Sequence, residues 1–174
     1  LAPNRKDLVE EFINKNLTDG SNSLRQGVVS FEYMNNSTYV GEANNSRSMA
    51  MEYTDINGDI YLGQWSDDLF HGEGTYLFSN GEFFTGKFHR GESTEGIYHY
   101  KNGNTYVGQF KEYKKHGFGK LHYLEQKAHF EGEWENGEKN GVGTYQCPEF
   151  SYSGTWNFGK KNGNAIVRGN RIEF

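Results

Sequence analysis

Six histidines are the side chains best suited to metal binding or proton transfer, because imidazole binds metals and titrates near neutral pH. His71 and His116 hold equivalent positions in the repeating pattern described below, each followed by glycine. In a regular array they would lie two units apart, on the order of 20 Å, too far to share a metal ion. The other four show no repeated relation to cysteine or carboxylate: His89, His99, His122 and His129. The sequence therefore predicts no metal site and no histidine base.

Other short motifs lack residues that phosphate binding, calcium binding or catalysis would require. The triplets Gly-Glu-Gly at 72–74 and Gly-Phe-Gly at 117–119 lack the further glycine or the Gly-Lys-Ser/Thr of phosphate loops. Residues 55–59, Asp-Ile-Asn-Gly-Asp, place glycine too early for a calcium loop and lack its closing glutamate. No nucleophile stands beside a base, so we predict a protein that is not an enzyme and needs no cofactor.

Composition narrows the class of protein further. Cys147 is the only cysteine, which excludes an internal disulfide and favours a reducing compartment. The sequence has no signal peptide and no apolar run near the roughly 20 residues that span a bilayer. A cytoplasmic location is expected. A net charge of −5 argues against nucleic-acid binding, and 16% aromatic residues argue against disorder.

Basic residues gather where short loops are expected within the repeats. They could contact anionic lipid headgroups or an acidic partner, but a solvated loop edge is the interpretation we favour, since lipid sites usually carry denser clusters. The candidate contacts are Arg90, Lys111, Lys114, Lys115, Lys160 and Lys161, with Lys139 in an equivalent loop.

These residues belong to a repeat of about 23 residues. An aromatic-x-Gly triplet recurs six times, ending at glycines spaced by 22, 23, 22, 24 and 22 residues: Gly41, Gly63, Gly86, Gly108, Gly132 and Gly154. Another large ring follows two residues later in five units, at Trp65, Phe88, Phe110, Trp134 and Trp156. A second glycine comes nine or ten residues after the first. Alternation of period two predicts strands, and Asn-Gly pairs predict tight turns with positive φ at both central residues.

Glycine has a packing role on the ring-bearing face of these strands. Gly63 lies between Tyr61 and Trp65 on one face, and a residue without Cβ lets a ring lie flat on the backbone. The opposite face, beginning with Leu62, carries mostly residues that water solvates well. We therefore predict an all-β repeat protein: a single-layer antiparallel meander of about six hairpins with one aromatic face.

The pattern Tyr-Leu-Gly-Gln-Trp at 61–65 with His-Gly-Glu-Gly-Thr-Tyr at 71–76, and its relatives, resembles MORN repeats (membrane occupation and recognition nexus). The resemblance covers residues 27–167; the first unit, with Ala43 and Ala50, and the last, with Ala165, depart from it. We predict an N-terminal helix and linker at 1–20 and an array at 21–174. Its units lie near 39–58, 59–81, 82–103, 104–127, 128–149 and 150–169, after a partial strand at 24–33.

Residues 4–17 have the apolar spacing of an amphipathic helix, with Leu8, Val9, Phe12, Ile13 and Leu17 on one stripe. Asn4 could cap it. A helix of this length is marginal alone, so we expect it to dock on its own sheet and cover aromatic surface. The alternatives are docking on a partner and a linker to an upstream segment.

The resemblance implies a scaffold in cytoskeletal, ciliary or membrane-associated assemblies at the inner face of a membrane. We predict binding of a protein partner, either a peptide, a helix or a second copy of the chain, along an aromatic groove. The alternatives are an accessory module of a larger enzyme, of the lipid kinase or lysine methyltransferase type, and a module for anionic lipids. The candidate groove residues are Tyr61, Trp65, Tyr76, Phe84, Phe88, Tyr98, Tyr106, Phe110, Phe130, Trp134, Tyr145, Tyr152 and Trp156.

Overall fold

A computed structural model describes residues 5–16, 21, 28–32, 34, 36–42 and 51–169. The chain divides into two compact units, Leu1–Glu92 (unit 1) and Ser93–Phe174 (unit 2). Each unit is described by itself.

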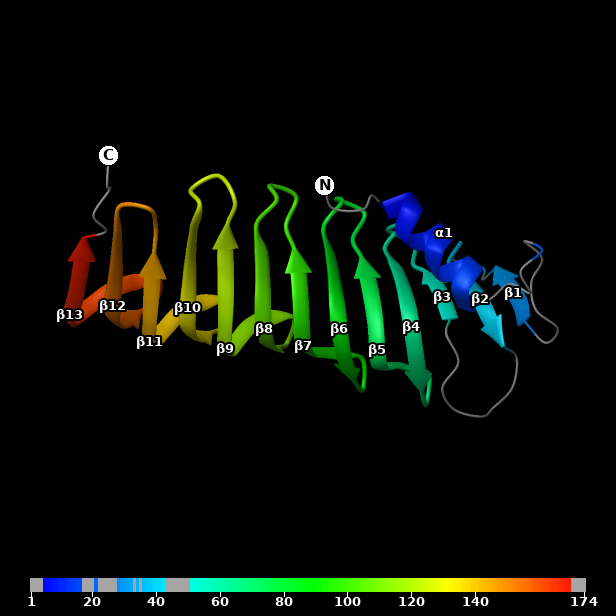
Figure 1. Cartoon of the computed structure of the whole chain (residues 1–174). Coiled ribbons are helices and arrows are strands. Elements are labelled where there is room, and N and C mark those ends of the chain that lie inside the picture. The colour runs from blue at the N-terminus through cyan, green and yellow to red at the C-terminus, as the bar shows by residue number, and fades with distance from the viewer. Residues whose placement is uncertain are drawn as a thin grey trace. The chain divides into compact units, whose positions relative to one another are not determined.

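Unit 1 holds one helix and an antiparallel meander (Figure 1). Each strand pairs with the next along the chain. The elements are α1 (Arg5–Asn16), β1 (Val28–Glu32), β2 (Thr38–Glu42), β3 (Met51–Thr54), β4 (Ile60–Ser66), β5 (Leu69–Leu77) and β6 (Phe83–His89).

Unit 2 repeats this meander without a helix among its described residues (Figure 1). Its strands also pair antiparallel in chain order. They are β7 (Glu92–His99), β8 (Thr105–Lys111), β9 (Lys114–Tyr123), β10 (Ala128–Glu135), β11 (Glu138–Gln146), β12 (Phe150–Asn157) and β13 (Lys160–Gly169). The predicted fold class, tandem antiparallel hairpins after a short helix, is confirmed.

The turns explain why consecutive strands pair so tightly. Within hairpins, two residues with positive φ form the connection, as at Asn136 (50°) and Gly137 (89°). This geometry matches the twist of the strands. The Asn-Gly pairs between repeats are predicted to have positive φ at both residues, and this prediction is wrong. At Asn57-Gly58 only the glycine has a positive φ, of 80°. The loop there is longer, and Gly58 N–H donates to Asp55 O at 3.0 Å. In this loop the asparagine keeps a negative φ.

In the repeats of Tyr61, Tyr106 and Phe130, the first ring lies over a pair of glycines, as predicted. Gly63 and Gly74 face each other across β4 and β5, and the Tyr61 ring covers both. A Cβ on Gly74 would come within 2.5 Å of Tyr61 Oη. The buried Tyr61 hydroxyl donates to Gln64 O at 2.8 Å. Burial by the sheet raises the pKa of Tyr61 far above its usual range.

The second glycine of a repeat marks a β-bulge. In β4 and β5 the register shifts between Gly63 and Trp65, opposite Gly72 with its φ of 64°. Gln64 Oε1 fills the resulting space and accepts a hydrogen bond from Glu73 N–H at 3.2 Å. Bulges of this kind use glycine in the left-handed region to re-aim the strand.

Helix α1 covers its own sheet, but the prediction that it covers the aromatic ring face is wrong, because it lies on the opposite face. Its partly buried residues Leu8, Val9 and Phe12 pack on a buried cluster of β4, β5 and β6. That cluster consists of Ile60, Leu62, Leu77 and Phe83. The prediction that this face is solvated is therefore wrong in unit 1, where Leu62 is only 3% exposed. The predicted cap Asn4, the last stripe residue Leu17 and residues 24–27 of the partial strand lie outside the described residues.

Candidate functional site

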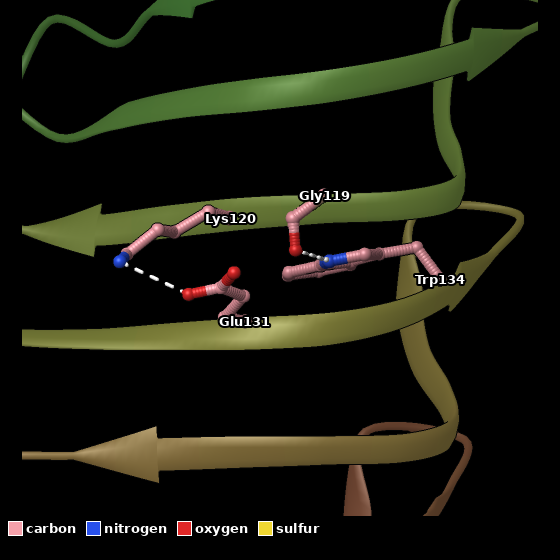
Figure 2. A network of polar contacts seen from close by, with 4 residues as sticks. All are labelled: Gly119, Lys120, Glu131 and Trp134. Atoms are coloured by element: carbon pink, nitrogen blue, oxygen red, sulfur yellow. Dashed lines mark hydrogen bonds and ion pairs between the residues drawn. The ribbon is translucent and has the colours of Figure 1, made fainter.

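The first layer of the candidate site is a floor of buried rings on one face of unit 2, here called the ring floor. Tyr106 and Phe130 lie over glycine pairs, and Tyr152 lies over Gly154, which faces Ala165. Neighbouring rings meet these three rings edge to face at 5.1–5.3 Å. Trp134 Nε1–H donates to Gly119 O at 3.0 Å, as Figure 2 shows. The ring floor consists of Tyr106, Phe110, Phe130, Trp134, Tyr152 and Trp156. Among the described residues of unit 2, these rings form the core of a single-layer sheet.

A second row of rings on the same face is only half-buried, and we call it the tyrosine strip. The register places Tyr98 opposite Tyr106 and Tyr145 opposite Phe130, so both rows share a face. Within the strip, ring centroids lie 4.6 Å apart for Tyr98 and Tyr100 and 6.2 Å apart for Tyr123 and Tyr145. The strip consists of Tyr98, Tyr100, Tyr123, Tyr145 and Phe150.

Three lysines hold equivalent positions on this face and form what we call the lysine row. In the strand register, Lys115 lies opposite Phe110, Lys139 opposite Trp134, and Lys161 opposite Trp156. Each lysine follows a two-residue turn, and its cross-strand partner belongs to the ring floor. The register therefore turns all three lysines onto the ring face.

The ammonium groups lie directly over aromatic rings. Lys139 Nζ is 4.7 Å from the centroid of Trp156 and 4.8 Å from that of Phe130. Lys115 Nζ lies 5.1 Å from Trp134, and Lys161 Nζ 4.4 Å from Tyr152. These distances are within the range of cation–π attraction. Lys139 also lies over two strip rings, at 5.3 and 5.6 Å, so it joins the floor to the strip.

The surroundings of Lys139 and Lys115 disfavour their positive charge. Burial lowers the pKa of Lys139 to about 8, with smaller contributions from the charges of Lys161 and Lys115. Burial also lowers the pKa of Lys115, whose ammonium group donates to Tyr100 Oη at 3.2 Å. Throughout the part of the chain that the structure describes, no carboxylate forms an ion pair with any of the three.

Lys139 should make the free energy of unfolding depend on pH. Its pKa is about 8 when folded and near the ordinary 10.5 when unfolded. Between these values the unfolded chain binds more protons, so stability should rise with pH across this window and be lowest below it. Denaturant unfolding at pH 8 and pH 10, for the wild type and Lys139→Met, measures this. The rise should be smaller in the variant; identical pH profiles would show that the lysine is fully solvated.

The structure separates the predicted groove residues into two groups. Buried residues, which support the sheet, are Tyr61, Phe84, Phe88, Tyr106, Phe110, Phe130, Trp134, Tyr152 and Trp156. Half-buried residues are Trp65, Tyr76, Tyr98 and Tyr145. Only the second group can offer surface to a partner. In unit 2, where the lysine row lies, that leaves Tyr98 and Tyr145.

The predicted cationic contacts also separate. Lys115, Lys139 and Lys161 lie over rings instead of along a loop edge, which corrects their predicted placement. Exposed cations elsewhere in the loops and strand ends are Arg90, Lys111, Lys114 and Lys160.

Sequence reasoning missed Tyr100, Tyr123 and Phe150, which complete the tyrosine strip. Each lies two residues from a ring-face position, at 98, 121 and 152, so the alternation of the strands could have found them. The position of the lysine row on the ring face could not be predicted without the cross-strand register, which depends on the bulges and turns.

The opposite face of unit 2 is more polar and carries scattered apolar residues. Lys120 and Glu131 form an ion pair across β9 and β10, with 3.0 Å between Nζ and Oε2 (Figure 2). The exposed apolar residues of this face are Ile97, Val107, Phe118, Val142 and Ile166. Single exposed apolar residues are ordinary on protein surfaces.

Neither a metal cluster nor a membrane span appears in the described part of the chain. No three metal-binding side chains come together there. The described helix is too short and too polar to cross a bilayer.

Comparison with known proteins identifies the repeat. Residues 61–83, 84–105, 106–123, 130–150 and 152–166 match the MORN repeat family, which together is more than half of the chain. MORN repeat-containing protein 3 of Xenopus laevis is 35% identical over an alignment of 115 positions, which covers 62% of this chain. The aligned region spans 29% of that relative's length.

Among solved structures, the SAS-4 (dCPAP) TCP domain of Drosophila melanogaster, in complex with a proline-rich motif of Ana2 (dSTIL), is similar at a TM-score of 0.45. The two chains are 12% identical, and the similarity covers 83% of this chain and 86% of that one.

Proposed function

Because the chain belongs to the MORN repeat family, we propose that it is a non-catalytic scaffold that binds a segment of a protein partner on the ring face of unit 2. The observation that carries this proposal is the tyrosine strip, which lies half-buried beside the lysine row. Tyrosine is enriched at binding hot spots, since it buries much surface while losing few rotamers. The strip therefore offers a partner rigid rings that are already ordered.

The two faces of unit 2 differ in what they offer. On the opposite face Lys120 already has a carboxylate partner, and Thr144 and Ser153 bond each other at 2.9 Å. The ring face combines half-exposed aromatic area with cations that lack carboxylates. That combination favours the ring face as the binding surface.

The cellular setting we propose is a cytoskeletal, ciliary or membrane-associated assembly, as expected for this repeat family. Within such an assembly the sheet would hold a partner in place and perform no reaction. A full-length sequence with a catalytic domain beside the repeats would instead favour an accessory role in an enzyme.

Substitution of one residue on each face tests the proposal. Tyr145→Ala removes a strip ring, and Val142→Ala trims an exposed residue of the opposite face on the same strand. A partner that co-purifies with the wild-type chain from the cells that make it should be lost from Tyr145→Ala and kept by Val142→Ala. Both variants must first show a wild-type circular dichroism spectrum. The reverse pattern would place the partner on the opposite face.

A further inference from the structure

We propose that the ring face of unit 2 is specific for an acidic segment of its partner, whose carboxylates pair with the ammonium groups of Lys115, Lys139 and Lys161. This inference rests on the proposed function and names the chemistry of the ligand. It follows from four properties of the lysine row.

The first property is charge without compensation. Three cations hold equivalent positions in successive repeats of a protein whose net charge is −5. Across the residues that the structure describes, carboxylates pair with other lysines, such as Lys120, and with none of the lysine row. An incoming carboxylate would supply the missing partner.

The second property is that the packing does not need a cation there. In unit 1, Phe70 occupies the repeat position that lysine holds in unit 2, and it lies opposite Trp65 across the hairpin. The Phe70 ring stacks on Tyr61 at 3.9 Å with an interplanar angle of 17°. An apolar side chain thus fills the position well, and lysine in three later repeats calls for another reason.

The third property is that burial over the rings disfavours the charged forms of Lys139 and Lys115. Burial among rings and repulsion from Lys115 and Lys161 both lower the pKa of Lys139. Groups with strongly perturbed pKa values cluster at functional sites. A bound carboxylate would favour the charged form of Lys139 and relieve the repulsion along the row.

The fourth property is the spacing. Equivalent lysines of neighbouring repeats are two strands apart, which is roughly 10 Å at about 4.8 Å per strand. A polyproline II helix covers about the same distance in three residues, at about 3.1 Å each, and its period of three brings every third side chain to the same side. Acidic residues at every third position of a segment in this conformation would therefore meet successive lysines, while the backbone contacts the tyrosine strip.

A protein segment suits this row better than a bilayer does. Lys115 and Lys139 are half-buried, with their ammonium groups directly over rings. A narrow peptide can reach such groups, whereas a flat membrane surface meets the outermost cations first. Three cations are also fewer than the four to eight or so that usually attract anionic lipid.

The test uses the full 174-residue chain and a fluorescein-labelled peptide with glutamate at every third position and tyrosine and serine between. Fluorescence anisotropy gives the dissociation constant. We expect Lys139→Met and Lys161→Met each to weaken binding by about tenfold, as for loss of a charge-assisted hydrogen bond. Lys120→Met removes the same charge from the opposite face and should bind like the wild type. A peptide with glutamine for glutamate should not bind.

Each other outcome decides against the proposal. Equal binding by wild type and Lys139→Met would place the acidic ligand elsewhere, and equal losses in Lys139→Met and Lys120→Met would show a non-specific effect of net charge. If the peptide fails to bind but vesicles of phosphatidylcholine and phosphatidylserine float the wild type and not Lys139→Met, the ligand is a membrane. If neither probe binds while Tyr145→Ala still loses the native partner, the acidic specificity fails and the proposed function stands.

Discussion

Gly108→Val should lower the free energy of unfolding by about 3 kcal/mol or more, because overpacking against atoms that cannot move is costly. A Cβ at this position would lie 2.6 Å from Gly119 Cα, 2.7 Å from Tyr106 Oη and 2.8 Å from Phe118 O. Two of these atoms belong to the paired backbone of β9 and cannot give way without breaking the register with β8. The added side chain would also displace the Tyr106 ring from its position over Gly108 and Gly119.

Val107→Thr, one residue away, is the matched control. Val107 is 44% exposed on the opposite face, so the change should cost under about 1 kcal/mol. Urea denaturation followed by tryptophan fluorescence measures both variants, since Trp134 and Trp156 report on the ring floor. Comparable losses from the two substitutions would contradict the assignment of the faces.

Tyr106→Ala should cost about 3–5 kcal/mol, as for other large aromatic truncations in a core. Tyr106 is fully buried, touches Phe110 and Trp134 edge to face, and donates to Gln109 O at 3.1 Å. An exposed groove-wall ring would tolerate this change, but the structure places Tyr106 in the ring floor. Tyr106→Phe keeps the ring and should recover most of the lost stability.

Tyr145→Ala gives the comparison within the same face. Tyr145 is half-buried in the tyrosine strip, so its truncation should cost clearly less than that of Tyr106. Thermal unfolding followed by circular dichroism ranks the three variants. If Tyr145→Ala proved as damaging as Tyr106→Ala, the strip would be part of the core and unavailable to a partner.

Much of this architecture was predictable from local sequence rules. The recurrence of aromatic-x-Gly predicts both the hairpins and the packing of the ring over glycine, because a glycine on the ring face has few other uses in a strand. Gly63 and Gly74 confirm this, with Tyr61 lying over both. Alternation also assigned Val107 to the opposite face correctly.

What the sequence could not predict depends on three-dimensional context. Lys115, Lys139 and Lys161 follow turns, and only the register opposite Phe110, Trp134 and Trp156 shows that they lie on rings. The burial of a repeat ring likewise depends on its neighbours in adjacent strands.

Helix α1 illustrates the same limit. Its apolar stripe predicts docking, but the choice of face follows from Ile60, Leu62, Leu77 and Phe83 forming a cluster opposite the rings. Leu62 and Val107 hold equivalent repeat positions, yet one is 3% exposed under the helix and the other 44% exposed.

The central claim, that a protein segment binds the ring face of unit 2, is tested most directly by site-specific photo-crosslinking. A benzophenone amino acid would replace Tyr123 in the tyrosine strip or, separately, Val142 on the opposite face. After irradiation in the cells that make the protein, mass spectrometry would identify the attached peptide. We expect an acidic segment of one protein attached at position 123 and none at position 142. Attachment only at position 142, or the same adducts at both, would contradict the account.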